Sequence, residues 1–569
     1  LCFMADDGSN TDGFMTEHME FADQLAGYVE SEHPEFLVNK LYYDAYKKDM
    51  TAGTYPDVRS GLQKLLKDGL LLFNYTGHGG TTALSDEKVL TQTDINQFTY
   101  THLPVWVTAT CDFTRFDDLN TSTGEDVFLN KSSGGIALFT TVRVAYSRPN
   151  FPINDNVIRN LFERNNGRRR TLGEVMQATK NTLSSVYKLG FCLIGDPAVK
   201  MAYPEFGMKV TTVNGQSVDG NSISFKALEK ITVEGEVLDA SGQLVTDFTG
   251  IVNPTVKDSK VTVTCLKNSN KDDSPAFTFT DYPNTIFIGN DSVRNGKFSF
   301  TFTVPKDISY SNLQGKMNLY AVDTESGNEA QGNFDNFIVG GTSDTAETDT
   351  IGPEIRALYL NDTTFVDGGQ VNTTPYFVAE LWDKSGVNIT GSSVGHDMML
   401  VIDESTVLSY NLNSYYELLP GEDGTGIVKF PIPALEPGKH TAEFWVWDIL
   451  NNSTVRTFTF EVVEGLKPFL FDVIATPGIA REQVTFHLMH NRPESRMRVG
   501  IMVYDLAGRQ LWKHEESGTS GLFENYTVSW DLTSGGARMR PGVYIYRAAI
   551  STDNSKDATK ARKFIILGE

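Results

Sequence analysis

The sequence predicts a multidomain protein in which an α/β domain is followed by antiparallel β-sandwich domains. Residues 1–205 alternate short apolar strands with amphipathic helical patterns, which is typical of a mostly parallel sheet with helices on both faces. After about residue 206 the helical periodicity disappears, and short alternating strands separated by Gly, Asn, Asp and Pro turns take its place. The length of 569 residues favours about four domains at roughly 150 residues each.

Each element of the first domain follows from its pattern of apolar residues. The helix expected over residues 14–32 has apolar positions at a spacing of three or four, namely Met15, Met19, Ala22, Leu25, Ala26 and Val29. Further helices are expected over Asp57–Lys67, Pro152–Arg164 and Leu172–Ser185. Continuous apolar runs predict buried strands at Leu1–Ala5, Gly69–Tyr75, Val105–Thr110 and Gly134–Thr141.

The rest of the chain divides into three blocks of strands. We expect β-sandwiches over residues 206–345, 346–466 and 467–569, each of about 100 residues. The segment Gly340–Asp349 is polar and acidic, which is typical of a linker.

Composition excludes some classes of function. The formal net charge of −23 argues against a nucleic-acid-binding protein, because phosphate contacts need clustered Lys and Arg. The chain lacks a run of 18 apolar residues, so we expect no transmembrane helix. It begins inside an apolar run without a charged leader, so we expect the natural N-terminus and any signal peptide to lie outside this sequence.

The four cysteines are Cys2, Cys111, Cys192 and Cys265. They form no CxxC pair and have no nearby His at zinc spacing, which argues against a metal site and against a disulfide scaffold. All but Cys111 lie inside apolar strands, so we expect those three to be small buried hydrophobes.

His78 and Cys111 are the candidate catalytic residues. Each follows an apolar strand, and ligands bind at the carboxyl ends of strands in an open parallel sheet. Glycines flank His78 and would let a substrate backbone approach closely. A cysteine thiolate next to an imidazolium is an activated nucleophile. A buried core cysteine and a turn histidine are the alternatives, but the joint placement at two strand ends of one sheet favours catalysis.

The motifs around these residues resemble one family. Gly77-His78-Gly79-Gly80, Thr110-Cys111-Asp112 and Gly195-Asp196-Pro197 resemble the gingipain-type (C25) caspase-like cysteine peptidases. This resemblance covers residues 1–205 and implies a caspase-like fold, with the backbone N–H groups of Gly79 and Cys111 as oxyanion donors. Ala5-Asp6-Asp7-Gly8, with His18 and Ala22-Asp23, is more similar to the sortase of the type IX secretion system than to a digestive gingipain.

The last block resembles the sorting domain of type IX cargo, which is an Ig-like sandwich. The resemblance rests on Ala475-Thr476-Pro477, His490-Asn491-Arg492-Pro493, Val503-Tyr504-Asp505-Leu506-Ala507-Gly508-Arg509, Pro541-Gly542-Val543-Tyr544 and Lys563-Phe564-Ile565-Ile566. The alternative is an ordinary β-sandwich, because several of these stretches are also good hairpin sequences.

The family resemblance also implies a carboxylate that orients the histidine. Glu17, Glu20 and Asp23 lie on the first helix, and Glu20 is the preferred candidate, although a solvated helix face would explain any one of them. We expect His18 to be a structural residue or to lie at the edge of the site.

No cofactor is expected, and calcium is the one candidate metal. Asp6, Asp7, Asn10 and Asp12 could hold a calcium ion through oxygen ligands, and a solvated acidic loop is the alternative.

The resemblance implies a cell-surface sortase associated with the outer membrane. Such an enzyme would cleave the C-terminal sorting domain from secreted cargo through a Cys111 thioester and transfer the cargo to an amine of anionic lipopolysaccharide. The outer-membrane barrel protein PorV would hold it at the surface. One alternative is a gingipain-like secreted protease that only hydrolyses, and another is a catalytically inactive surface-binding protein.

The first specificity pocket is expected to be shallow. Residues 31–56 offer Glu32, Glu35, Asp44 and Asp49, which look like solvated charges rather than a pocket floor for Arg or Lys. Phe113, Phe116 and the loop Ala145-Tyr146-Ser147 could narrow the pocket with aromatic bulk, which would favour Gly, Ala or Ser before the cut.

Overall fold

The computed structural model describes the chain except residues 8–15, 99, 101, 132, 166, 269–274, 344–348, 391–394, 420–424, 553 and 568–569. By its internal contacts the chain forms two compact units. The first contains residues 1–304 and 308–342, and the second contains residues 305–307 and 343–569. No helix within the described ranges is long and apolar enough to cross a membrane.

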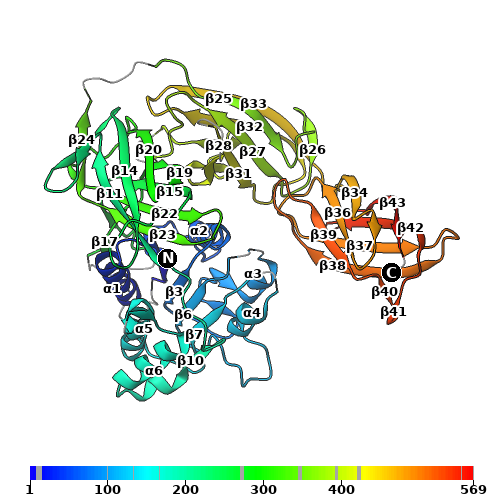
Figure 1. Cartoon of the computed structure of the whole chain (residues 1–569), viewed down its shortest axis with the longest axis horizontal. Helices are drawn as coiled ribbons and strands as arrows, with labels where there is room; N and C mark the ends of the chain where they lie inside the picture. The colour runs from blue at the N-terminus through cyan, green and yellow to red at the C-terminus, as the bar shows by residue number, and fades with distance from the viewer. Residues whose placement is uncertain are drawn as a thin grey trace. The chain divides into compact units, whose positions relative to one another are not determined.

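The first unit begins with the predicted α/β domain, built on a six-stranded sheet in the order β10-β7-β6-β3-β1-β2. The strands are β1 (Cys2–Ala5), β2 (Asn39–Tyr42), β3 (Leu72–Thr76), β6 (Val105–Ala109), β7 (Ala137–Thr141) and β10 (Phe191–Ile194). All neighbours pair in parallel except β10, which is antiparallel to β7 at the edge. Figure 1 shows helices flanking this sheet.

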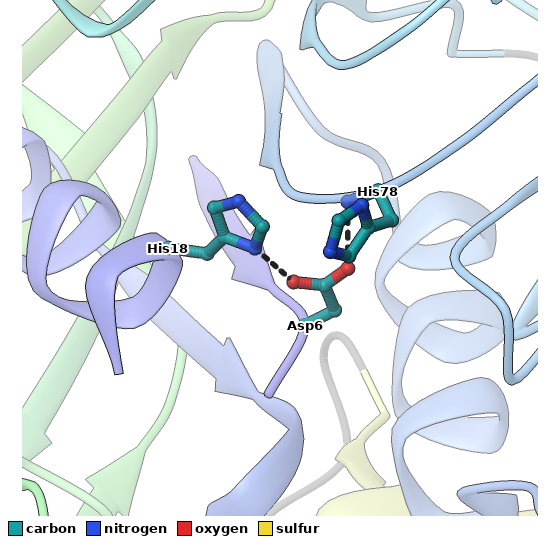
Figure 2. A group of neighbouring side chains, drawn as sticks. All are labelled: Asp6, His18 and His78. Carbon is teal, nitrogen blue, oxygen red and sulfur yellow. Dashed lines mark hydrogen bonds and ion pairs between the residues drawn. The ribbon is translucent and has the colours of Figure 1, made fainter. Parts of the chain in front are cut away.

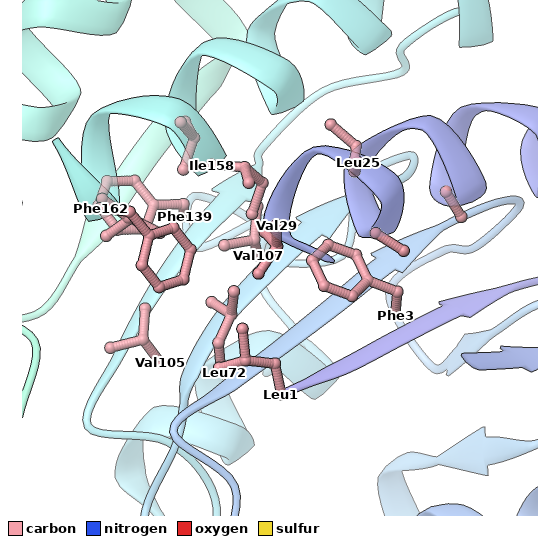
Figure 3. Packing of buried hydrophobic residues seen from close by; sticks show 14 of the residues in the cluster. Leu1, Phe3, Leu25, Val29, Leu72, Val105, Val107, Phe139, Ile158 and Phe162 are labelled. Atoms are coloured by element: carbon pink, nitrogen blue, oxygen red, sulfur yellow. The ribbon is translucent and has the colours of Figure 1, made fainter. Parts of the chain in front are cut away.

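Helices cover both faces of the sheet because its strands are apolar on both sides. One core joins Phe3, Leu72 and Val107 to helices α1 (Glu17–Glu32), α5 (Ser147–Phe162) and α6 (Leu172–Thr182), as Figure 3 shows in part. The second core joins Met4, Phe73 and other residues of the opposite face to α2 (Pro56–Asp68), α3 (Gln92–Gln97) and α4 (Thr123–Leu129). The predicted parallel sheet with helices on both faces is therefore present.

The structure departs from the prediction at helix α5 and at strand β2. Helix α5 begins at Ser147 rather than at Pro152, which lies inside it. A proline argues for a helix start when only the sequence is read, because it lacks the N–H that an interior position donates. The strand β2 was not predicted, because its residues Asn39-Lys40-Leu41-Tyr42 include polar side chains. Lys40 is nevertheless buried, and its ammonium group pairs with Asp23 at 2.9 Å.

The prediction of a sandwich for residues 206–345 is wrong, because seven strands close into a barrel. The ring runs through β11 (Phe206–Val213), β14 (Lys230–Leu238), β20 (Lys297–Thr303), β19 (Asp291–Arg294), β15 (Gly250–Lys257), β22 (Lys316–Asp323) and β23 (Glu329–Phe334). It closes through a parallel pairing of β11 with β23, in which Phe206 faces Ala330 and Gly207 faces Gln331. The alternating pattern of buried and exposed residues is the same in a barrel and in a sandwich, so the sequence could not separate them.

The second unit contains two further pairs of sheets. The first pair lies within residues 354–462, and its sheets have the orders β25-β27-β31-β30 and β26-β33-β32-β28-β29 around one core. Their strands are β25 (Glu354–Leu360), β26 (Gly369–Val371), β27 (Tyr376–Trp382), β28 (Met399–Ile402), β29 (Ser409–Asn411), β30 (Tyr416–Leu418), β31 (Thr425–Pro431), β32 (Gly438–Trp447) and β33 (Ser453–Val462). The second pair lies within residues 470–566, and its sheets have the orders β34-β36-β39 and β35-β43-β42-β37-β38 around another core. Their strands are β34 (Leu470–Thr476), β35 (Ile479–Ala480), β36 (Val484–His490), β37 (Met497–Tyr504), β38 (Gln510–Gly518), β39 (Tyr526–Trp530), β42 (Gly542–Ser551) and β43 (Ala558–Ile566). Each pair of sheets contains one parallel pairing, β26 with β33 in the first and β35 with β43 in the second. The antiparallel, Ig-like sandwiches expected for residues 346–466 and 467–569 stay a prediction.

Candidate active site

The candidate site lies at the carboxyl ends of three neighbouring strands. Ala5 of β1, Thr76 of β3 and Ala109 of β6 stand in one row across the sheet. His78 and Cys111 are each the second residue after this row, and both line a cavity of about 580 Å³. The structure thus brings the predicted nucleophile and base to the same edge of the sheet and to one cavity.

The backbone of His78 is fixed from two sides. Its N–H donates to Oδ2 of Asp6 at 2.6 Å, and its carbonyl accepts from the Tyr75 hydroxyl at 2.7 Å and from the Ser85 N–H at 2.9 Å. A Cβ added at Gly77 would lie 2.5 Å from the Tyr75 hydroxyl and 2.7 Å from Cγ of Asp6. Gly77 therefore has to be a glycine for Asp6 and Tyr75 to reach His78.

Asp6 joins two histidines in a buried cluster (Figure 2). Its Oδ1 lies 2.5 Å from Nδ1 of His18, and the rings of His18 and His78 meet edge to face with centroids 5.0 Å apart. Burial alone would raise the pKa of Asp6, but the charges and hydrogen bonds of His18 and His78 outweigh burial and lower it below its ordinary value. Asp6 is therefore ionised at neutral pH and places a negative charge beside the His18 ring and the His78 backbone.

The acidic side chains proposed for the third catalytic position lie elsewhere. Glu20 is exposed, and its carboxylate accepts from the Thr16 hydroxyl at 2.6 Å. Asp23 pairs with Lys40 at 2.9 Å. Glu17 does line the cavity, where it pairs with Arg148 at 3.1 Å. Sequence reasoning named Asp6 only as a candidate calcium ligand and did not place it beside His78, although Asp6 directly follows a strand end, which is the signal that identified His78 and Cys111.

Possible cation ligands are found in two places. Asp7 accepts from the Tyr55 hydroxyl at 2.8 Å and lies 3.7 Å from the Lys48 ammonium, while Asn10 and Asp12 lie outside the described residues.

Asp6, His18 and His78 place ligand-type atoms within 4.8 Å of one another, a mixed nitrogen and oxygen set that suits zinc better than calcium. An all-oxygen set, which suits calcium, is formed in the second unit by Asp349, Asp383 and Asp448. Calcium near Asp6, Asp7 and Asp12 stays a prediction.

The thiol of Cys111 is held by the loop that follows β7. Its Sγ donates to the Ala145 carbonyl at 3.0 Å and accepts from the Ala145 N–H at 3.4 Å. Burial raises the pKa of Cys111; the hydrogen bond from the Ala145 N–H acts in the opposite direction, and the Asp112 carboxylate raises the pKa further. The resting group is therefore a thiol at neutral pH, and attack on a carbonyl needs a base to remove its proton.

The two predicted oxyanion donors are available. In the described part of the chain, no hydrogen bond uses the backbone N–H of Gly79 or of Cys111. A Cβ at Gly79 would lie 2.5 Å from Oγ1 of Thr110, so a larger residue would push this loop away from the end of β6. Both N–H groups remain free to bind a developing negative charge on a substrate oxygen.

The lining of the cavity agrees only in part with the expected first pocket. Ala145, Tyr146 and Ser147 line it, whereas Phe113 is fully buried in the core and the half-exposed Phe116 lies outside the lining. None of the acidic residues of segment 31–56 contributes to it. Among the described lining residues of the cavity the acid is Glu17, and Arg148 compensates its charge.

Alkylation should report how His78 acts on the thiol. Cys2 and Cys265 are buried, and burial raises the pKa of each to about 12, so both should resist iodoacetamide. Cys111 should react first. In His78→Ala its labelling at pH 7 should slow at least about tenfold, because the pKa of Cys111 is raised and few of its thiols ionise when no base removes the proton. Peptide mapping by mass spectrometry measures both rates.

Cys192 provides the internal control for this experiment, because it is half-buried like Cys111 but lies on the edge strand β10. Its labelling rate should not change in His78→Ala. Equal rates at Cys111 in the two proteins would show that His78 does not activate the thiol.

Comparison with known proteins supports the family that the motifs resemble. Residues 1–202 match the family model of Peptidase family C25, which confirms the predicted family for this part of the chain. The sequence has no match among the curated proteins.

Two solved structures from Porphyromonas gingivalis show similarity to the chain. Dimeric latent PorU is 26% identical at a TM-score of 0.32, over 100% of this chain and 64% of that one. The complex of RgpB pro- and mature domains is 18% identical at a TM-score of 0.28, over 59% of this chain and 67% of that one. The present chain thus spans less than two thirds of the PorU structure.

Proposed function

We propose that the C25 peptidase domain formed by residues 1–202 is a cysteine endopeptidase with Cys111 as nucleophile and His78 as base. The strongest support is the common position of these residues just after three neighbouring strands. His78 and Cys111 follow the ends of β3 and β6 and line one cavity, and Asp6, which follows β1, is ionised and bonds the His78 backbone. Asp6 replaces Glu20 as the carboxylate that positions the base and stabilises its charged form.

The geometry supports a two-step acyl transfer. His78 removes the Cys111 proton, and the thiolate attacks the peptide carbonyl while its oxygen accepts from the Gly79 and Cys111 N–H groups. The tetrahedral intermediate breaks its C–N bond, and His78 returns the proton to the leaving amine. This leaves a Cys111 thioester and a new N-terminus. Water or another amine then attacks the thioester, His78 takes up the proton of that nucleophile, and the thiol of Cys111 is restored.

The finer proposal is a sortase of the type IX secretion system that acts at the cell surface. Its substrates would be secreted proteins with C-terminal sorting domains, its acceptor an amine of anionic lipopolysaccharide, and its surface partner PorV. Support comes from the family match and from the last block, where the sorting-type motifs occupy a two-sheet structure. For example, Val543-Tyr544 begins β42 (Gly542–Ser551), and Phe564-Ile565-Ile566 ends β43 (Ala558–Ile566).

The product made from a sorting-domain substrate tests this function. We expect cleavage at the junction before the sorting domain, and with an added primary amine we expect part of the released cargo to carry that amine as an amide. Hydrolysis alone at every amine concentration would favour the gingipain-like protease. An absence of both products would favour the inactive surface-binding protein.

Substrate preference should follow from the charge of the cavity. Because Arg148 already compensates Glu17, the described lining of the cavity offers no unpaired carboxylate for an Arg or Lys side chain before the cut. A peptide library should show better cleavage after Gly, Ala or Ser than after Arg or Lys. A strong preference for Arg or Lys would contradict this and favour a digestive protease.

The last block should serve surface attachment and not catalysis. Residues 470–566 form their own core, and every residue of the proposed machinery lies before residue 112. Deleting residues 467–569 should release the protein from cells into the medium while retaining peptidase activity on a short peptide. If the truncated protein stays at the surface, another part of the chain provides the attachment.

A further inference from the structure

A second cavity of about 430 Å³ lies in the first unit, and none of its lining residues belongs to the candidate active site. It is formed where helices α1 and α5 end, at Glu32 and Phe162, beside the segment that leads into β11. Gln331 of β23 completes its lining, so the α/β domain and the barrel both contribute. The proposed peptidase reaction does not use this cavity.

Five rings in mutual contact form the wall of this cavity, namely Tyr28, His33, Phe36, Phe162 and Tyr203. The ring of Phe162 lies with its centroid 5.1 Å from those of His33 and of Phe36. The contacts continue from His33 to Tyr28 at 5.9 Å and from Phe36 to Tyr203 at 5.9 Å. Such a row of rings presents several π faces and edges within one small space.

This ring cluster already attracts cations from its own chain. The Arg159 guanidinium lies 4.1 Å from the centroid of Tyr28, and Arg169 lies 4.6 Å from that of Tyr203. A cation within about 6 Å of an aromatic face is stabilised by the ring quadrupole. Arg159 bonds Asp155, whereas Arg169 pairs with Glu205, a carboxylate that Arg164 also uses.

Two acidic side chains stand at the rim. The Glu32 carboxylate lines the cavity and makes no hydrogen bond or ion pair within the described part of the chain, although its charge acts on the nearby Arg159. Glu35 lies 3.7 Å from His33. Of the other charged lining residues, Glu163 bonds Arg170, while Arg164 shares Glu205 with Arg169, so one guanidinium charge offsets part of this acidic rim. The C-terminal ends of α1 and α5 add partial negative charge, because their last carbonyls point out of each helix.

We propose that this cavity is a binding site for a compact organic cation, an alkylammonium group. Aromatic walls combined with an acidic rim are the arrangement that recognises such groups, and the volume is enough for a small ligand or for one side chain of a bound peptide. An inorganic cation would need several oxygen ligands in place of its hydration shell, which an aromatic wall does not supply.

Binding of choline to the whole chain, measured by calorimetry or by ligand-observed NMR, tests this proposal. Its uncharged isostere 3,3-dimethylbutan-1-ol has the same shape without the charge, so it should bind at least about fivefold more weakly. N-acetyl-lysine amide, compared with N-acetyl-norleucine amide, shows whether a primary ammonium on a peptide is also accepted. Equal binding of choline and its isostere would overturn the proposal.

Variants then locate the site. Glu32→Gln with Glu35→Gln should weaken choline binding by about fivefold to tenfold, and Tyr28→Leu should weaken it about threefold. These residues are half-buried or exposed, so the fold should survive, which the unfolding temperature checks. Glu464→Gln, at an exposed glutamate of the second unit, is the matched control and should bind as the unaltered chain does. Unchanged binding in the double variant would place the cation elsewhere and overturn the assignment.

Discussion

Replacing Cys111 by alanine should abolish peptide cleavage while leaving the fold intact. Removing a nucleophile that acts with its base as a unit lowers turnover by about 10⁴-fold to 10⁶-fold. The thiol is half-buried and makes its hydrogen bonds only to Ala145, so the free energy of unfolding should change by no more than about 1–2 kcal/mol. Cleavage assays and thermal unfolding measure the two effects separately.

Cys192→Ala is the matched control for this experiment. Cys192 has similar burial but lies outside the cavity lining, and its removal should leave cleavage unchanged. Residual cleavage above about 1% of the normal rate in Cys111→Ala, with Cys192→Ala fully active, would exclude Cys111 as the nucleophile.

Asp6→Asn should produce the second largest loss of activity, about 10²-fold to 10⁴-fold in turnover. The carboxylate accepts from the His78 backbone and binds His18, and its negative charge favours the imidazolium that forms when His78 takes the Cys111 proton. An amide keeps the shape but loses that charge. Breaking this buried cluster should also lower the free energy of unfolding by about 3 kcal/mol at pH 7.

The pH dependence of that stability loss has a defined sign. The pKa of Asp6 is lowered below its ordinary value of 3.8, so its ionised form stabilises the folded chain above that pH. The difference between the unaltered chain and Asp6→Asn should therefore shrink as the pH falls below about 4. Denaturant unfolding at several pH values measures it.

Glu20→Gln is the control for the positioning role. Glu20 is exposed and bonds only Thr16 among the described residues, so its replacement should change turnover less than about twofold. If Glu20→Gln were inactive and Asp6→Asn active, the original preference for Glu20 would be right and the role given to Asp6 wrong.

The parallel sheet and the placement of His78 and Cys111 could be predicted because both depend on local patterns. A continuous apolar run predicts a buried strand, and the residues after parallel strands meet at one edge. The same rule applies to Asp6, but the three acids and the asparagine within residues 6–12 also fit an acidic loop, and this second pattern hides the strand end. Its partner His18 lies on helix α1, and no local pattern shows that the helix brings this ring to Asp6.

Closure of the barrel could not be predicted, because it depends on one contact between distant strands. Phe206 and Ala330 pair in parallel, although each strand alone has the alternating pattern of any half-buried strand. The second cavity was missed for the same reason. His33 and Phe162 come from the ends of two helices far apart in the sequence, and only the tertiary fold brings their rings to 5.1 Å.

A covalent acyl-enzyme on Cys111 is the most direct test of the proposed chemistry. The unaltered chain is mixed with a cleavable peptide, quenched in acid after short intervals, digested and mapped by mass spectrometry, with hydroxylamine added in a parallel reaction. We predict that the Cys111 peptide carries the N-terminal part of the substrate and that hydroxylamine converts this part to a hydroxamate. Full cleavage with neither an adduct on Cys111 nor a hydroxamate would contradict the thioester mechanism.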